Sequence, residues 1–474
     1  MQLRLCANQP LHGMLKVEDD HGTLAATPVH MQTLGRLDLT LPAPPDERSL
    51  RVWLDSVLIY DSGGEQHRLK RPLAIAEGYD YESVEGVYLQ AREWERQRFP
   101  SRALPCYVAC LLADPWHLRA LVGMARLKQR HMEYEDSLGF LSKALSIDTY
   151  DGEANYLYGL AHARLGNIYD AKDGFSVAGQ DPAYRSAAMT ELARTSMQQG
   201  QHARALEYVA AALAGNPGNC GALRLQVVAL IRLGRTAEAR DLAAGRLLAD
   251  PLDHVLRYAS GMRSGICITS EWPHQTWLEI AAFYAGIEEW KEASESLQQS
   301  PEHPMVELWK AWIYFKTSGN VDAVALEKVQ QMSPEGVFPH RQEELTILRW
   351  AVTHSEGWKL KYFLSLGLIQ LMQEEEARVL LTSCGDEPGW YPFYLVRSGI
   401  SGDGGADLLK AVDIAPDAWR PALRLSKHYA EKQQWGRPWV RRRKDISGIP
   451  ATTILVFGWR TAICTTDNTR RPSD

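Results

Sequence analysis

The spacing of apolar residues changes twice along the sequence. Thr33–Leu41 and Leu50–Tyr60 are rich in β-branched and bulky apolar residues, which is typical of strands. From about Val84 onward, apolar residues recur three and four positions apart, which predicts helices broken by Gly, Asn, Asp or Pro. From Gly436 to Asp474 the helical period is lost. The pattern therefore predicts a mostly α protein with a small β segment at its start and an irregular end.

The N-terminal segment, residues 1–78, is predicted to hold two or three short strands. A Pro-rich turn at Pro42–Asp46 separates the two apolar runs, and Asp61–Gly64 forms a second turn. So few strands cannot bury both faces of a sheet. We therefore expect this segment to be the remnant or edge of a β domain that needs a partner. That partner is the helical part, another polypeptide or a β domain that is missing here.

One pattern of small and bulky residues repeats every 34 residues between residues 79 and 253. A small residue is followed four positions later by a bulky one, three later by a small one, and about five later by Pro. The five occurrences are Ala103, Tyr107, Cys110 and Pro115; Ser137, Leu141, Ala144 and Thr149; Ala171, Phe175, Ala178 and Pro182; Ala205, Val209, Ala212 and Pro217; and Ala239, Ala243, Arg246 and Pro251. Small residues let two antiparallel helices approach closely, and Pro ends the second helix of each unit. This pattern resembles the tetratricopeptide repeat, and it predicts five helical hairpins stacked into a solenoid.

Residues 254–435 are predicted to continue this array as more degenerate helical repeats. Four further stretches resemble one unit each: Trp277–Leu297, Trp309–Met332, Trp358–Leu381 and Phe393–Pro416. Residues 252–272 do not fit a unit and are expected to lengthen or bend the array. Ser333–Ser355 is also loose in register.

The last stretch, residues 436–474, differs from the repeats in composition. It holds eight Lys and Arg residues against three Asp residues, and it is rich in Thr. Just before it, Tyr429–Trp435 resembles the first helix of a repeat that has no second helix, although a solenoid end needs a polar capping helix. Two interpretations stay open: a native, irregular basic tail, or a non-native sequence produced by a reading-frame error near Trp435.

Composition and charge narrow the possible functions. The net charge of −6 and the pI of about 6.2 give no basic footprint, so we expect no nucleic-acid partner. No apolar run is long enough for a membrane span, and Met1–Asp20 lacks the apolar core of a signal peptide, so we expect no membrane partner and a cytoplasmic location. The seven cysteines match no zinc or disulfide framework. Cys106 and Cys110 share a helix face and are expected to pack as small apolar residues.

No catalytic motif is recognisable in the sequence. Gly402–Gly405 is a glycine-rich turn with neither a preceding strand nor a Lys, unlike a phosphate-binding loop. Asp170 and Asp173 lie three positions apart where a helix begins, which favours a role as helix N-terminal charges. We therefore predict that this protein is not an enzyme and needs no cofactor or metal.

Several longer motifs resemble those of one bacterial family. They are Ile147–Asp151, Glu153–Ala161, Asp170–Phe175, Tyr184–Ala188, Trp358–Tyr362 and Cys384–Pro388. Members of this family carry a galactose-mutarotase-like β-sandwich domain of unknown function, followed by tetratricopeptide repeats. Over roughly residues 30–435 this sequence resembles the C-terminal repeat portion of such a protein. The resemblance implies that most of the β-sandwich is absent here, so no residue of a sugar site carries over.

Arginine recurs along one face of the five predicted units. The family architecture implies that the first helix of each unit lines a concave groove with its second, fifth, ninth, twelfth and thirteenth residues. Counting from Val84, Leu118, Gly152, Ser186 and Cys220, the ninth and thirteenth places include Arg92, Arg96, Arg126, Arg130, Arg164, Arg194 and Arg232, and two fifth places hold Tyr88 and Tyr156. Guanidinium groups bind carboxylates through paired hydrogen bonds. The line therefore predicts a groove for an acidic peptide, the C-terminus of a polypeptide or another anion, to which the two tyrosines add contacts.

A plainer interpretation of the same residues is that each Arg pairs with a neighbouring acid, such as Glu93 or Glu95, and is solvated, while the tyrosines pack in the core. With the groove interpretation, the protein is a non-catalytic repeat scaffold that binds a protein or peptide through its concave face. The alternative rests on resemblance alone. In that alternative the protein is a C-terminal accessory part of a carbohydrate-active or sugar-binding protein, whose partner would be a carbohydrate-related β domain.

Overall fold

The computed structural model describes residues 2–7, 10–33, 35–41, 50–62, 80–261 and 272–432. The protein divides into two compact units, Met1–Asp80 and Tyr81–Asp474. The predicted turn at Pro42–Asp46 and the basic stretch at 436–474 lie outside the described residues, so they stay predictions.

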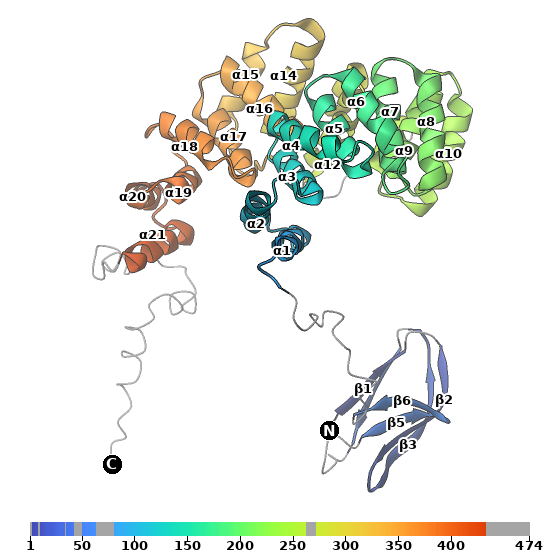
Figure 1. Ribbon diagram of the computed structural model, residues 1–474. Coiled ribbons are helices and arrows are strands. Elements are labelled where there is room, and N and C mark those ends of the chain that lie inside the picture. The colour runs from blue at the N-terminus through green and yellow to red at the C-terminus, as the bar shows by residue number, and fades with distance from the viewer. Residues whose placement is uncertain are drawn as a thin grey trace, which may run out of the picture. The chain divides into compact units, whose positions relative to one another are not determined.

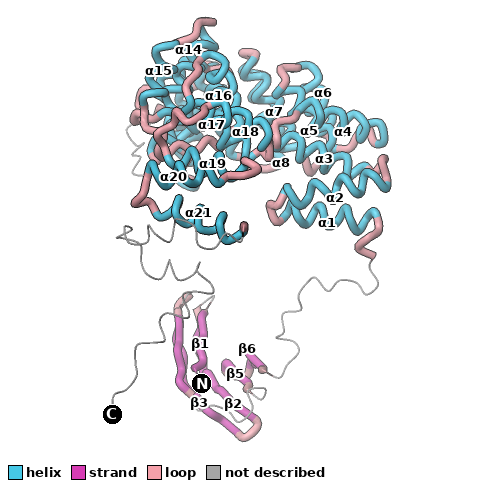
Figure 2. Tube along the Cα trace, turned by 90° about the vertical axis from the view of Figure 1, so that its left-hand side faces the viewer, coloured by secondary structure: helices cyan, strands magenta, loops and turns pink. Residues whose placement is uncertain are grey.

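Within its described residues, the N-terminal unit holds six strands in two antiparallel sheets (Figure 2). The strands are β1 (Gln2–Cys6), β2 (Leu11–Asp19), β3 (Gly22–Met31), β4 (Arg36–Thr40), β5 (Arg51–Leu54) and β6 (Val57–Asp61). β1 pairs with β4, and the other four form a sheet in the order β3-β2-β5-β6. One hydrophobic cluster serves both sheets. Its buried members are Leu15, Val17, Val29, Leu41, Leu50 and Val52, and half-buried leucines of β1 and β4 pack against them.

Two expectations for this unit are wrong. Leu50–Tyr60 is not one strand, because the backbone turns at Asp55, whose φ of +52° reverses its direction between β5 and β6. The Asp55 carboxylate accepts a hydrogen bond of 2.8 Å from the backbone N–H of Met14, which ties this turn to β2. The described residues of the unit also form six strands rather than two or three, and these bury a cluster of their own. The argument that too few strands are present to form a core therefore does not hold.

The helical unit begins with five consecutive hairpins (Figure 1). Their helices are α1 (Val84–Arg96) and α2 (Pro100–Ala113), α3 (Leu118–Arg130) and α4 (Tyr134–Ile147), α5 (Gly152–Arg164) and α6 (Ile168–Ala178), α7 (Arg185–Gln198) and α8 (His202–Gly215), and α9 (Cys220–Arg232) and α10 (Thr236–Ala249). The predicted small and bulky positions of the second helices are buried, from Ala103 in α2 to Ala243 in α10, except that Arg246 is only partly buried. Bulky side chains such as Tyr107 leave so little room that a Cβ on Gly123 would lie 2.5 Å from the Tyr107 ring.

The first helices start where they do because of their N-cap residues. Ser83, His117, Asp151 and Asn219 each accept a hydrogen bond from the backbone N–H three residues later, which satisfies an otherwise unpaired donor. These caps keep the 34-residue spacing. Arg185 stands at the same place before the fourth unit and cannot cap in this way, and α7 there begins at Arg185 itself, one residue before the predicted Ser186.

The later helices are less regular than the first ten. They are α11 (His254–Ala259), α12 (Pro273–Ala285), α13 (Trp290–Leu297), α14 (Pro304–Ser318), α15 (Ala323–Gln331), α16 (Gln342–His354), α17 (Trp358–Gln370), α18 (Glu374–Ser383), α19 (Tyr391–Ile400), α20 (Gly405–Ile414) and α21 (Trp419–Glu431). α11, in the stretch that fits no unit, has only six residues. α16, in the stretch of loose register, lies between the α14–α15 and α17–α18 hairpins and packs against α14 and α17. No described helix is long and apolar enough to cross a membrane.

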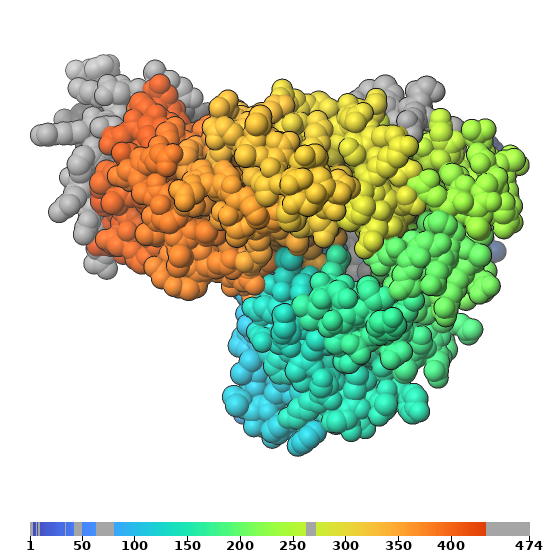
Figure 3. Space-filling view, turned by 90° about the horizontal axis from the view of Figure 1, so that it is seen from above, coloured from blue at the N-terminus to red at the C-terminus, as the bar shows by residue number. Residues whose placement is uncertain are grey.

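The helical array folds back so that later helices contact the first ones. Figure 3 shows the orange surface of the later helices lying against the teal surface of the earlier ones. The two parts share a core, because one hydrophobic cluster runs from Ala193 in α7 to Ala411 in α20. Met132, in the turn between α3 and α4, also packs against this cluster. The inner face of the first five hairpins is therefore partly covered by later helices of the same protein.

Candidate peptide-binding groove

The four arginines at the thirteenth places end four of the first helices. Arg96, Arg130, Arg164 and Arg232 are the last residues of α1, α3, α5 and α9. A positive charge in the last turn interacts favourably with the helix dipole, so these positions suit Arg even without a ligand. Whether any of them can bind a ligand depends on the partners that the fold already provides.

Arg126 is held in a network that joins the first three hairpins. Its Nη2 lies 2.6 Å from Oε2 of Glu95 and its Nε lies 3.0 Å from Oε1 of Glu95, while Nη1 pairs with Glu153. The Tyr107 hydroxyl also donates to Glu95. Burial raises the pKa of Glu95, but the hydrogen bonds from Arg126 and Tyr107 outweigh it and leave that pKa below its usual value. Arg126 is thus a structural link between α1, α3 and α5.

Arg96 and Arg194 pair with acids on their own helices. Arg96 makes two hydrogen bonds, of 2.7 and 2.8 Å, to Glu93, and its side chain is largely exposed. Arg194 Nε lies 3.2 Å from Glu191. The Arg96 pair is solvated, so it contributes little to stability and leaves the guanidinium accessible, whereas the Arg194 pair is less than one-third exposed. These two arginines match the plainer interpretation of the sequence.

Arg164 and Arg232 pair with acids of the later helices. Arg164 Nη1 lies 3.1 Å from Oε1 of Glu343, at the start of α16. Arg232 binds Glu289 through two hydrogen bonds of 2.7 Å and also contacts Glu292, at the start of α13. Carboxylates of the same protein therefore occupy these two arginines.

Arg92 and Arg130 form no ion pair with any residue that the structure describes. Both side chains are exposed; Arg92 has a long contact, of 3.5 Å, with the Tyr88 hydroxyl and also lowers the pKa of Glu95 electrostatically. Arg119, at the second place of its unit, is exposed and also lacks an ion pair among the described residues. Arg119 is missing from the predicted line of arginines because that line consists of ninth and thirteenth places only. Second places were already named as groove-facing, so the signal was present.

The two predicted tyrosines are packing residues in this structure. Tyr88 is buried, with its ring 6.3 Å from Tyr107 and 5.0 Å from His117, centroid to centroid. The Tyr156 ring packs against Phe175 and Tyr184, and burial raises its pKa to about 12. Their ring faces are therefore engaged by other aromatic residues.

A hollow of about 480 Å³ lies among α1, α3 and α5, on the predicted groove face. It is lined by Tyr88, Leu89, Arg92, Leu118, Arg119, Val122, Asp151 and Glu153. Asp151 caps α5 and Glu153 binds Arg126, so both acids already have partners. Arg92 and Arg119 have no ion-pair partner in the described part of the molecule and lie in a mainly polar hollow beside a few apolar residues, which is an arrangement that suits a carboxylate ligand.

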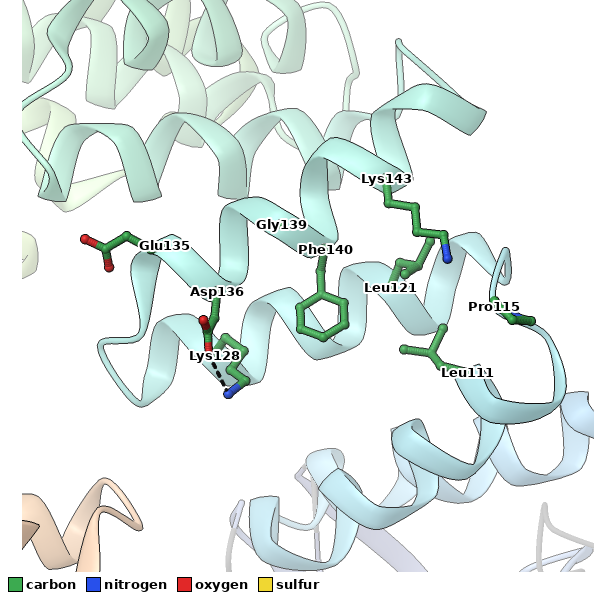
Figure 4. A pocket seen from close by; sticks show the side chains of 9 residues that line it. All are labelled: Leu111, Pro115, Leu121, Lys128, Glu135, Asp136, Gly139, Phe140 and Lys143. Carbon is green, nitrogen blue, oxygen red and sulfur yellow. Dashed lines mark hydrogen bonds and ion pairs between the residues drawn. The ribbon is translucent and has the colours of Figure 1, made fainter. Parts of the chain in front are cut away.

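A second hollow of about 580 Å³ lies between α2, α3 and α4 (Figure 4). Its apolar residues include Leu111, Leu121 and Phe140. Lys128 at its edge is 3.0 Å from Asp136, the pair that Figure 4 marks with a dashed line. Its acidic and basic residues thus partly neutralise one another, so the charge here favours neither an anion nor a cation.

Outside the two hollows, the described part of the protein has few side chains that could bind a metal or take part in a reaction. No group of three or more His, Cys, Asp or Glu residues there is arranged to hold a metal ion. Burial raises the pKa of the Cys106 and Cys110 thiols, and Cys110 is fully buried, so both suit apolar packing. Asp170 lies in the first turn of α6, and Gly404 precedes the first residue of α20.

Comparison with known proteins finds repeat sequence of a recognised kind within the helical part. Residues 196–260, from the end of α7 to α11, match the tetratricopeptide-repeat family. Similar solved structures include a tetratricopeptide repeat protein from Parabacteroides merdae, with 13% identity, 60% coverage of this protein, 98% of that protein and a TM-score of 0.36. They also include MamA protein (21% identity, 35% and 91% coverage, TM-score 0.32) and pilF of Pseudomonas aeruginosa (16%, 52% and 96%, TM-score 0.34). No curated protein matches the sequence.

The fold is therefore mostly α: a tetratricopeptide-type solenoid of helical hairpins with a small N-terminal β segment. This confirms the fold class predicted from the 34-residue pattern. Proteins of this class are in general non-catalytic scaffolds that bind other proteins or peptides. The family match covers repeat sequence alone, so the resemblance to proteins with a mutarotase-like domain stays a prediction.

Proposed function

We propose that this protein is a non-catalytic scaffold that binds an acidic segment of a protein or peptide in the hollow formed by α1, α3 and α5. The observation that carries the proposal is the pair Arg92 and Arg119. Both line the hollow, and neither has an ion-pair partner among the described residues. The other arginines of the line mostly have acidic partners within the protein, so this pair marks where an external carboxylate would bind.

The apolar residues of the hollow fit a peptide better than a free anion. Leu89, Leu118 and Val122 lie beside the two arginines. A peptide buries such residues with its own side chains while its carboxylates meet the guanidinium groups, and each charge-assisted hydrogen bond is stronger than a neutral one. A small inorganic anion would use the arginines alone.

A cytoplasmic location is part of the same proposal. Cys106, Cys110, Cys220 and Cys384 are free thiols in the described residues, as is usual where thiols are kept reduced. No described feature favours the alternative role as an accessory part of a carbohydrate-active protein, so we do not propose it.

Fluorescence anisotropy with a labelled oligoglutamate and the full-length protein tests the proposal. The Arg92→Ala/Arg119→Ala variant should bind at least about tenfold more weakly, because each lost charge-assisted hydrogen bond contributes about 1.5–3 kcal/mol. Arg204→Ala/Arg240→Ala, on α8 and α10, removes the same charge away from the hollow and should bind almost normally. Equal weakening by both variants would show nonspecific attraction and would overturn the proposal.

A further inference from the structure

The contact between α3–α5 and α16–α18 covers part of the same groove face, and we call it the seam. Its polar interactions are the Arg164–Glu343 ion pair and two hydrogen bonds, and Met132 packs beside them against the shared hydrophobic cluster. The Tyr134 hydroxyl donates to Oε1 of Gln342 over 3.3 Å, and Nε2 of Gln373 donates to the backbone carbonyl of His131 over 2.8 Å. Residues that are 179 to 242 positions apart in the sequence thus meet beside Arg130, at the end of α3.

The seam is weaker than the contact that α12 and α13 make with the first five hairpins. Its ion pair is about half exposed on both sides, and exposed pairs contribute little because water screens them. In contrast, Arg232 is bound by two glutamates that are mostly buried, and the aromatic residues Trp277 and Tyr284 of α12 are buried in the same region. The α12–α13 contact is therefore the more deeply buried of the two, so the seam is the contact expected to open first.

We propose that the seam is an autoinhibitory contact, in which Glu343 occupies Arg164 in place of an acidic ligand. This inference rests on the proposed function. When the seam is closed, ligand is restricted to the hollow of α1, α3 and α5. When it opens, Arg164 joins Arg130 in a longer cationic surface that continues from the hollow. An acidic ligand binds the open form more tightly, so ligand binding and seam closure compete.

The position of Tyr134 indicates that the polar groups of the seam separate together when it opens. Burial raises the pKa of its hydroxyl, and both Arg164 and Glu343 act on it electrostatically. Tyr134, Arg164, Gln342 and Glu343 are thus one local cluster, which joins α4 and α5 to the start of α16. Opening separates the two sides of this cluster and exposes its polar groups to water together.

Two seam variants test this inference with the same oligoglutamate probe. Tyr134→Phe/Gln373→Ala removes both hydrogen bonds without changing the charge, and Glu343→Gln removes the competing carboxylate. Each should bind the probe about threefold to tenfold more tightly than the wild type, since the apparent affinity rises with the fraction of open form. Amide hydrogen exchange of segments 130–136 and 340–346 should become faster. Gln331→Ala and Glu207→Gln, which lie on α15 and α8 away from the seam, are the matched controls.

The outcomes separate this inference from the proposed function. If neither the wild type nor any variant binds the probe, the proposed function fails and the inference fails with it. If the wild type binds but the uncharged double variant binds no more tightly, the inference alone is overturned. Tighter binding by Glu343→Gln only would likewise overturn it, because a change of local charge would then explain the effect without opening.

Discussion

The first three hairpins and the helices from α7 onward bury their apolar residues in different ways. In the first three hairpins the buried side chains form separate small clusters, each shared by neighbouring helices. From α7 to α20 one large cluster, which includes Trp309, Phe363 and Phe393, holds most of the buried side chains, beside two smaller clusters at α9–α11 and α20–α21. Stacked repeats normally contact only their neighbours, so the first part behaves as a solenoid and the second resembles the core of a globular domain.

This difference explains how the later helices of the array come to cover part of the groove that the first hairpins form. The regular hairpins place equivalent residues on one line, which is why arginine recurs along the inner face. The short α11 and the single helix α16 interrupt that regularity, and the array then curves back over the line. The regular hairpins therefore form the candidate groove. The irregular helices α11 and α16 determine how much of that groove stays uncovered.

The largest expected effect tests whether the two cores differ in cooperativity. Trp309→Ala should lower the free energy of unfolding by about 3–5 kcal/mol, because it empties a large site in the shared cluster. Leu141→Ala, in a small cluster of the first part, should lower it less and leave the α7–α20 cluster folded. Urea unfolding followed by circular dichroism and by Trp fluorescence measures both.

The control for this comparison is Trp419→Ala, because Trp419 is about half exposed and lies outside the shared cluster. It should change stability by less than about 0.5 kcal/mol. The contrary outcome is that Leu141→Ala and Trp309→Ala each unfold in a single transition and lose the same free energy of unfolding. The helical unit would then fold as one cooperative body, and the distinction between the two parts would fail.

The 34-residue pattern predicted the first ten helices closely because their packing is local. Small residues such as Ala103 and Ala171 are needed wherever two helices cross, so each unit carries the same signal. A second signal was available but unused: Gly166, Gly200 and Gly234 have φ between +69° and +81° in the turns between paired helices. Like the caps, these turns recur at the period of the repeat, so sequence could have shown both.

The fold-back could not be predicted from the sequence, since it depends on curvature accumulated over many helices. Arg164 and Glu343 are far apart in the sequence, and neither sits in a local motif that names the other. The number of strands was predicted wrongly for a different reason. β3 carries Pro28 because it is an edge strand, where one N–H side is unpaired, and a proline there argues against a strand when sequence is considered alone.

A second prediction compares the arginine that links the first hairpins with the one at the seam. Arg126→Met should lower stability by about 2 kcal/mol, since it leaves the buried carboxylate of Glu95 without its ion pair. Arg164→Met should lower it by less than about 1 kcal/mol, as expected for a half-exposed pair. Thermal unfolding monitored by circular dichroism distinguishes them. Equal losses would mean that the seam is as firm as the internal network.

A third prediction concerns how the stability of the later helices depends on pH. The rings of His274 and His303 stack with centroids 3.7 Å apart, and burial, with His274 nearby, lowers the pKa of His303 to about 4. The unfolded state takes up this proton near pH 6.5, so the folded state loses stability as pH falls from about 6.5 to 4. The loss should reach about 2 kcal/mol and then level off, with partial exposure reducing it.

His303→Asn is the matched variant for this pH effect. His303 caps α14 by accepting a hydrogen bond from the backbone N–H of Met305, and Asn can accept the same bond without titrating. Urea unfolding at several pH values should show a shallower loss between pH 6.5 and 4 for this variant. An unchanged slope would assign the acid sensitivity to other groups.

The smallest expected effect concerns the turns that repeat between paired helices. In the first two hairpins, Arg98 and Met132 have φ of +63° and +61° at the place where the next three have Gly. A side chain there strains the backbone, so Arg98→Gly should raise stability by about 0.5–1 kcal/mol. Gly200→Ala should lower it by about 1 kcal/mol, and only through the backbone, because an added Cβ would meet no atom within 4 Å. Differential scanning calorimetry can resolve both, and opposite signs would confirm that the two kinds of hairpin share one turn geometry. A loss of stability in Arg98→Gly would instead show that the Arg98 side chain stabilises its turn by more than the strain it causes.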